Sequence, residues 1–174
     1  MKNEDRCKKV ELILSDVDGV LTDGGIIFDN QGIELKRFHS RDGLGIKQWR
    51  RGGFTFGILT ARSSHIVKVR AAELGVDVVR QGFEEKLSVA LEVISELGLE
   101  PDQVAFIGDD LTDLPVMRTV GLAIAVADAC DEVRSAAQHV TKLAGGQGAV
   151  REAIEFILKA KGSWDDLVRK YTGQ

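Results

Sequence analysis

Cysteine is scarce in this sequence, and its scarcity excludes two kinds of site. Only two of the 174 residues are cysteine, Cys7 and Cys130, and they form no CxxC pair. Two cysteines so far apart give neither a framework of disulfides nor a zinc site. A hydrophobic content of 44% is ample for an apolar core. We therefore expect one domain over residues 1–174.

Long apolar runs and an excess of basic residues are also missing. No run approaches the roughly 20 apolar residues that span a bilayer, and the charged start MKNEDRCKKV lacks the apolar region of a signal peptide. The net charge is −4, whereas a nucleic-acid partner usually needs a basic face. We therefore expect a cytoplasmic protein with reduced thiols and with no membrane or nucleic-acid partner.

Short apolar runs alternate with amphipathic stretches along the chain. Runs that end at polar residues are typical of strands buried on both faces of a parallel sheet, and they occur at 10–16, 54–60, 75–82, 103–110 and 121–127. Helical spacing occurs at 63–75, 84–98, 111–121 and 148–162. This alternation predicts an α/β fold with a doubly wound parallel sheet. The helix over 84–98 is expected to bury one face formed by Leu87, Ala90, Leu91, Ile94 and Leu97.

One segment interrupts the alternation. Residues 24–39 predict two strands joined by the turn Asp29-Asn30-Gln31-Gly32. Because this hairpin follows directly after an acidic cluster, we interpret it as a flap over a site. The alternative is an edge hairpin that only packs. At the other end of the chain, a C-terminal helical tail is expected over about residues 148–174.

Carboxylates gather after two of the predicted strands. Asp16 and Asp18 follow the first apolar run, and Asp109, Asp110 and Asp113 follow the run VAFIG. In open α/β sheets ligands bind at the carboxyl ends of strands. A cluster of carboxylates there is costly without a cation, and oxygen ligands favour Mg²⁺. The glycine of DVDG stands at the fourth position instead of the sixth, which excludes a calcium-binding EF-hand. A solvated acidic turn is the remaining alternative.

A divalent cation beside a free carboxylate indicates phosphoryl transfer. One aspartate can attack phosphorus and form an aspartyl-phosphate. A second, two positions on, can protonate the leaving alkoxide and then activate water. Thr60 at the end of GILT and Lys86 after RQGFEE can supply a hydroxyl and a cation for the phosphoryl oxygens. Taken singly, Thr60 is also compatible with a strand-end cap and Lys86 with a solvated side chain.

Four motifs in this order resemble those of the haloacid dehalogenase superfamily: DVDGVLTDG, Thr60, Lys86 and GDDLTD. The resemblance implies that Asp16 is the nucleophile and Asp18 the general acid/base. It also implies that Mg²⁺ is held by Asp16, the backbone carbonyl of Asp18 and Asp109. An aspartate at position 18 favours a phosphatase or a mutase. The other expected site residues are Asp110 and Asp113 behind the metal, and Gly19, Thr60, Ala61, Arg62, Lys86 and Arg41 around phosphate and substrate.

The spacing of these motifs leaves no room for a cap domain. The stretch from Asp18 to Thr60 is taken up by the hairpin and one helix, and that from Thr60 to Lys86 by a helix and a strand. A separate cap needs about 50 residues or more. We therefore expect a Rossmann-like haloacid dehalogenase fold with a β-hairpin flap and no cap. Its site is open to a larger substrate or covered by a neighbouring subunit.

Nearly the whole chain resembles the family of 3-deoxy-D-manno-octulosonate 8-phosphate (KDO 8-phosphate) phosphatases. The matching stretches are FHSRDGLGIK, ILTARSS, AVADA and GGQGAVRE. The resemblance implies a role in lipopolysaccharide biosynthesis and a homotetramer in which each hairpin joins a central barrel. It also implies a tail that can reach a neighbour's site. Ala61 stands where this family often has Gly, and Gln147 where it often has Arg or Lys.

Two other functions remain open from the sequence. A related activity removes phosphate from a nine-carbon keto-deoxy sugar acid, and its pattern has an acidic residue in place of Arg62. An arginine suits a carboxylate-bearing eight-carbon substrate better. The other alternative is a catalytically idle module that regulates or tetramerises, although no residue of the four motifs is missing.

Overall fold

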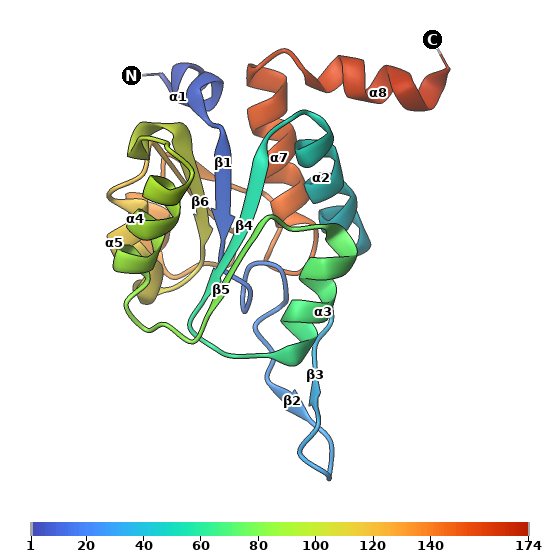
Figure 1. Ribbon diagram of the computed structural model, residues 1–174, viewed down its shortest axis with the longest axis vertical. Helices are drawn as coiled ribbons and strands as arrows, with labels where there is room; N and C mark the ends of the chain where they lie inside the picture. The colour runs from blue at the N-terminus through green and yellow to red at the C-terminus, as the bar shows by residue number, and fades with distance from the viewer. Residues whose placement is uncertain (1, 174) are drawn as a thin grey trace.

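The computed structural model describes residues 2–173, and a parallel sheet lies at its centre (Figure 1). Within this range the sheet has six strands in the order β5-β4-β1-β6-β7-β8, and every neighbouring pair is parallel. The strands are β1 (Leu12–Ser15), β4 (Thr55–Thr60), β5 (Val78–Gln81), β6 (Val104–Gly108), β7 (Leu122–Ala125) and β8 (His139–Val140). The predicted α/β fold with a doubly wound parallel sheet is therefore confirmed.

Helices cover both faces of the sheet. In Figure 1, α2, α3 and α7 lie on one side of the strands, and α4 and α5 lie on the other. The helices are α1 (Asn3–Lys9), α2 (Ser40–Arg51), α3 (His65–Leu74), α4 (Lys86–Glu96), α5 (Leu114–Met117), α6 (Asp131–Ala136), α7 (Ala149–Ala160) and α8 (Trp164–Thr172). No helix between residues 2 and 173 has both the length and the apolar character needed to cross a membrane.

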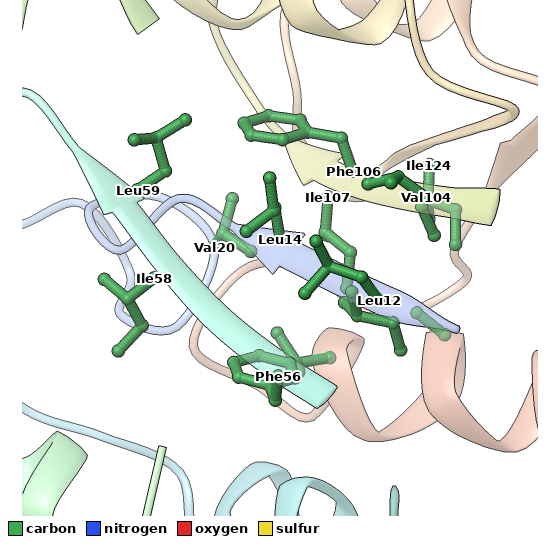
Figure 2. Packing of buried hydrophobic residues seen from close by; sticks show 14 of the residues in the cluster. Leu12, Leu14, Val20, Phe56, Ile58, Leu59, Val104, Phe106, Ile107 and Ile124 are labelled. Atoms are coloured by element: carbon green, nitrogen blue, oxygen red, sulfur yellow. The ribbon is translucent and has the colours of Figure 1, made fainter. Parts of the chain in front are cut away.

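The apolar run of β1 forms the middle of the core. All four of its residues are buried, and the strand lies between β4 and β6. Figure 2 shows Leu12 and Leu14 among Phe56 from β4 and Phe106 and Ile107 from β6. Burying one such side chain contributes about 1.5–3 kcal/mol. The apolar runs therefore fix the central strands, and with them the positions of the polar residues that follow.

Helix α4 forms where it was predicted, but part of its predicted buried face is wrong. Leu91 and Leu97 were expected to be buried and are 41% and 40% exposed. A helix has 3.6 residues per turn, so a shift of its buried stripe by one residue turns such side chains outward. The stripe that packs on the sheet is made by Val89, Ala90, Val93 and Ile94.

The predicted hairpin is present and projects from the end of the molecule at which the central strands finish (Figure 1). Its strands β2 (Ile27–Phe28) and β3 (Glu34–Leu35) are antiparallel. At the turn, the N–H of Gly32 donates a hydrogen bond to the carbonyl of Asp29 (3.0 Å). Between the motifs the described chain contains this hairpin, single helices and strands, and no cap domain.

Candidate active site

Three neighbouring strands bring the predicted site residues to one edge of the sheet. Asp16 follows β1, Thr60 ends β4, and Asp109 follows β6. The N–H of Asp16 also donates to the carbonyl of Ile107 (3.0 Å), which continues the pairing of β1 with β6. Parallel strands place their carboxyl ends at a common edge. The arrangement that the sequence predicted for these three residues is therefore present.

Asp16 is held in a fixed orientation. Its side chain is nearly buried, its Oδ1 accepts a hydrogen bond from the N–H of Val17 (2.7 Å), and its Oδ2 lies 2.9 Å from Nζ of Lys86. Burial, together with the nearby Asp113 carboxylate, raises the pKa of Asp16 to about 6, although Lys86 opposes the shift. A carboxylate held this way has little freedom to turn away from a bound phosphoryl group.

Lys86 is the first residue of α4 and is fully enclosed. Its side chain is 1% exposed, and its Nζ lies 2.7 Å from Oδ1 of Asp113 as well as close to Asp16. Burial alone would lower the pKa of Lys86, but the Asp113 and Asp16 carboxylates outweigh it and raise the pKa. The ammonium therefore stays charged. The alternative of a solvated lysine is wrong.

Asp109 completes an acidic cluster that suits a cation. One oxygen from each of Asp16, Asp109 and Asp113 lies within 4.8 Å of the other two. Burial, followed by the Asp113 and Asp16 charges, raises the pKa of Asp109 to about 8. Its Oδ1 is buried and accepts no hydrogen bond from residues 2–173. A buried, unpartnered carboxylate oxygen among hard oxygen donors fits a divalent cation such as Mg²⁺.

The last two aspartates of GDDLTD, Asp110 and Asp113, differ in burial. Asp113 is fully buried; its Oδ1 accepts from Lys86, and its Oδ2 accepts from the N–H groups of Asp109 (2.9 Å) and Asp110 (3.4 Å). Its oxygens are therefore occupied by the protein, which fits the predicted place behind the metal. Asp110 is exposed, and its side chain accepts from the N–H of Leu111 (2.8 Å) at the start of a short 3₁₀ turn.

Asp18 lies on the loop between β1 and the hairpin. Its carboxylate contacts Nζ of Lys36 (2.5 Å), the Thr22 hydroxyl (3.3 Å) and Nε of Arg62 (3.6 Å). Arg62, on the turn after β4, is 43% exposed and so can reach both Asp18 and solvent. Thr60 is buried at the end of β4, and Ala61 follows it half-buried.

Of the remaining predicted arginines, Arg41 stays apart. It is exposed in the first turn of α2, its backbone N–H donates to Nδ1 of His39 (3.3 Å), and its guanidinium makes no ion pair within the described part of the chain. Within residues 2–173 of one protomer, Arg41 therefore forms no ion pair with the acidic cluster.

Two functional candidates on the hairpin were missed by sequence reasoning. Lys36 contacts Asp18, and Glu34 accepts hydrogen bonds from the Ser64 hydroxyl (2.6 Å) and from Arg62 (3.3 Å). The signal was available: Glu34 and Lys36 alternate with apolar residues in GIELKRF. A period of two puts them on one face of an extended strand, which here is the face toward the site.

A glycine-rich loop before α7 packs against the loop that follows β1 in the same chain. A Cβ on Gly145 would lie 1.7 Å from the carbonyl oxygen of Gly19. The N–H of Gly146 donates to the carbonyl of Val20 (2.9 Å), and that of Gly145 donates to Asp128 (2.8 Å). Glycine is required here because the two backbones touch. Helix α8 lies at the opposite end of the sheet from this loop (Figure 1).

Sequence comparisons show which known proteins this chain is similar to. The model of the haloacid dehalogenase-like hydrolase family matches residues 70–154. The 3-deoxy-D-manno-octulosonate 8-phosphate phosphatase KdsC of Escherichia coli K12 is 42% identical over 161 residues, which cover 92% of this chain and 86% of that protein.

Solved structures are similar over almost the whole chain. The KDO 8-phosphate phosphatase of Moraxella catarrhalis, in complex with magnesium, phosphate and KDO, superposes with a TM-score of 0.95 at 39% identity and covers 97% of both chains. A probable YrbI family phosphatase from Pseudomonas syringae gives a TM-score of 0.96 at 45% identity, with 97% of this chain and 96% of that chain covered. This chain therefore belongs to the KDO 8-phosphate phosphatase family of the haloacid dehalogenase-like hydrolases.

Proposed function

We propose that this protein is a Mg²⁺-dependent phosphatase that hydrolyses KDO 8-phosphate to KDO and inorganic phosphate through an aspartyl-phosphate. The observation that carries the proposal is the position of Asp16. One of its oxygens is held by Lys86 at 2.9 Å, and its carboxylate belongs to the cluster with Asp109 and Asp113. A relative of the same fold binds magnesium, phosphate and KDO, which supports this substrate class.

In the first step, an Asp16 carboxylate oxygen forms a bond to phosphorus while the bond from phosphorus to the sugar oxygen breaks. Asp18 gives its proton to the departing oxygen. In the second step, Asp18 removes a proton from water, and the water oxygen attacks phosphorus. The bond between phosphorus and the Asp16 oxygen breaks, so inorganic phosphate leaves and the Asp16 carboxylate is restored.

The other residues of the site bind the metal, orient the substrate and neutralise charge on the phosphoryl oxygens. We assign Asp16, Asp109 and the backbone carbonyl of Asp18 to the metal, which when bound neutralises charge on the phosphoryl oxygens. Lys86 supplies a second, fixed positive charge 2.9 Å from Oδ2 of Asp16. The remaining contacts to phosphate and substrate are assigned to Thr60 and to the backbone of Gly19 and Ala61.

Arg62 is the proposed contact for the substrate carboxylate. Its guanidinium is partly exposed at the rim of the site and lies 3.6 Å from Asp18. An arginine can bind a carboxylate through two parallel hydrogen bonds. Both candidate substrates are sugar acids, so this contact alone does not separate them. KDO 8-phosphate is favoured because the sequence pattern of the nine-carbon activity has an acidic residue in place of Arg62. We assign no substrate contact to Arg41.

We further propose that the protein is a cytoplasmic homotetramer assembled through its hairpins. The hairpin exposes large apolar side chains that a lone protomer leaves in water, and contiguous exposed apolar surface marks sites of association. They are Ile26, Ile27, Phe28, Ile33 and Leu35, each 47–56% exposed. Because α8 lies at the far end of the sheet from its own site, any contact of this tail with a site would be made in a neighbouring subunit.

The test is a substrate panel with a matched pair of variants. Purified protein is assayed with KDO 8-phosphate, a nine-carbon keto-deoxy sugar acid 9-phosphate and unrelated sugar phosphates, in Mg²⁺ and in EDTA. We expect the highest kcat/KM for KDO 8-phosphate and loss of activity in EDTA. Asp16→Asn should lower the rate by up to about 10⁶-fold. Asp23→Asn, a partly exposed aspartate of the same motif, should stay near wild type.

Three results would contradict the proposal. Phosphate release by Asp16→Asn near the wild-type rate would exclude this residue as the nucleophile. A higher kcat/KM for the nine-carbon substrate would contradict KDO 8-phosphate as the substrate and the role proposed for Arg62 in choosing it. Absence of activity on the whole panel in Mg²⁺ would favour an idle assembly module.

A further inference from the structure

Four charged side chains form a closed ring beside the acidic cluster. Lys36 Nζ lies 2.5 Å from Asp18 and 3.3 Å from Glu34. Arg62 lies 3.3 Å from Glu34 and 3.6 Å from Asp18. Cation and anion therefore alternate around the ring. The Ser64 hydroxyl donates a further hydrogen bond to Glu34 (2.6 Å), which fixes one corner of the ring to the start of α3.

The lysine of the ring is deeply buried although it belongs to an exposed hairpin. The Lys36 side chain is 1% exposed, and those of Asp18 and Glu34 are 16% exposed. An enclosed ammonium is costly unless it is paired and hydrogen-bonded. The Ser64 hydrogen bond, with help from Lys36 and Arg62, outweighs burial and lowers the pKa of Glu34. Glu34 is therefore a charged partner for Lys36 and Arg62.

The ring joins three segments that are far apart in sequence. Asp18 comes from the loop after β1, Glu34 and Lys36 come from β3 and the residue after it, and Arg62 comes from the turn after β4. Within residues 2–173, Lys36 is the nearest partner of the Asp18 carboxylate, closer than Thr22 or Arg62. The orientation of Asp18 therefore depends chiefly on a side chain of the hairpin.

We propose that Lys36 is a positioning residue for phosphoryl transfer. Its ammonium holds the Asp18 side chain toward the reacting oxygen, both when Asp18 carries the proton that it gives up and when it is the carboxylate that takes a proton from water. Glu34 keeps Lys36 and Arg62 in place. The inference rests on the proposed role of Asp18 as general acid/base. Misplacement of a catalytic group by about 1 Å can cost roughly 10²-fold in rate. Since Lys36 belongs to the hairpin, this contact also makes the alignment of Asp18 dependent on the order of the hairpin.

The experiment is a double-mutant cycle on Lys36 and Asp18, measured with KDO 8-phosphate and with p-nitrophenyl phosphate. Lys36→Met should lower kcat on the sugar phosphate by roughly 10²-fold. The loss should be smaller on p-nitrophenyl phosphate, whose leaving group needs no proton. In an Asp18→Asn background, Lys36→Met should change the rate less than about threefold, because residues that act through one another are non-additive. Lys36→Arg keeps the charge and should recover part of the loss.

The matched control is Arg37→Met. Arg37 is the next residue of the hairpin and also pairs with an aspartate, Asp23, but its side chain is 71% exposed. It should keep wild-type kcat on both substrates. Thermal unfolding and Mg²⁺ affinity from calorimetry are measured for each variant, and Lys36→Gln replaces Lys36→Met in the cycle if the latter does not fold.

The outcomes distinguish a failure of the inference about Lys36 from a failure of the proposed function. If Lys36→Met matches Arg37→Met on both substrates, or if its loss adds fully to that of Asp18→Asn, Lys36 does not act through Asp18 and the inference is overturned. An equal loss on both substrates also overturns it. Wild-type activity in Asp18→Asn would instead contradict the proposed role of Asp18 itself.

Discussion

Gly19 lies directly against the carboxylate of Asp109. A Cβ at position 19 would be 2.0 Å from Oδ2 of Asp109, and the backbone φ of Gly19 is +93°. Position 19 therefore needs glycine for two independent reasons: the conformation and the contact. The first and fourth motifs meet at this point, so the placement of Asp109 depends on the absence of a side chain at the residue directly after Asp18.

Gly19→Ala should therefore damage the site beyond its effect on backbone strain. Strain at such a φ costs about 1–3 kcal/mol, and the added methyl group also displaces Asp109. We expect weaker Mg²⁺ binding by calorimetry and at least a 10²-fold loss in kcat/KM. Gly32→Ala is the control, since Gly32 has a φ of +78° with nothing within 4 Å of a Cβ. Equal effects of the two substitutions on Mg²⁺ affinity would argue against the contact.

Lys86→Met should destabilise the protein strongly in the absence of metal. The substitution leaves Asp16 and Asp113 buried without their shared cation, and breaking a buried ion pair from one side costs about 3–5 kcal/mol. Urea unfolding in EDTA measures the loss. Lys8→Met removes an exposed pair with Glu4 and should cost less than about 1 kcal/mol. A comparable loss for both lysines would show that Lys86 contributes no more than a surface charge.

The central strands were predictable because their apolar runs have to be buried. The positions of the residues that follow them were predictable because each of these residues stands where a buried strand ends. The run that contains Leu12 and Leu14 has to be enclosed on both faces, and Asp16 then stands at the edge of the sheet. Thr60 and Lys86 were identified as further site residues from their order along the chain. Sequence reasoning succeeded where a position along the chain determines a position in space.

Sequence reasoning failed where tertiary packing decides which side chains are buried and which short elements form. Leu91 was assigned to the core because helical spacing alone allows it. In the structure the row of side chains that includes Val93 packs against the sheet, and Leu91 is exposed. Helices α1 and α6 and strand β8 were not predicted, since each is short and its apolar pattern is weak. Lys36 was missed because a lysine in a hairpin is normally solvated, and only the fold-back of the hairpin brings it to Asp18.

Charged substitutions at the hairpin tip should disrupt the proposed tetramer without unfolding the protein. Phe28 and Ile33 are 54% and 56% exposed in the protomer, so replacing either by Asp costs little within one subunit but places a charge in the proposed interface. We expect light scattering to report a smaller species for Phe28→Asp and Ile33→Asp. Val69→Asp, on α3 and 55% exposed, should leave the assembly unchanged. An unchanged mass for all three variants would place any interface elsewhere.

The stability of the metal-free protein should fall as pH rises. The pKa of Asp109 is raised to about 8 and that of Asp16 to about 6, chiefly by burial. A carboxyl group whose pKa is higher in the folded than in the unfolded state stabilises the fold below its unfolded value near 4. That stability is lost as pH rises through the folded value. In EDTA we therefore expect Tm to decrease from about pH 5 to about pH 9, with the steepest part below pH 8.

Mg²⁺ should reverse this loss, because it binds the ionised carboxylates of the folded state only. A concentration of 100 times Kd adds about 2.7 kcal/mol. Asp109→Asn removes the charge that burial penalises, so in EDTA at pH 8 it should be more stable than wild type and should gain little from Mg²⁺. Asp102→Asn, which alters an exposed pair with Lys9, should follow the wild-type pH profile and the wild-type response to Mg²⁺. If Asp109→Asn shows the same pH slope as wild type in EDTA, the carboxyl group of Asp109 is already ionised at no cost in the folded protein. The acidic cluster would then need no cation to balance it.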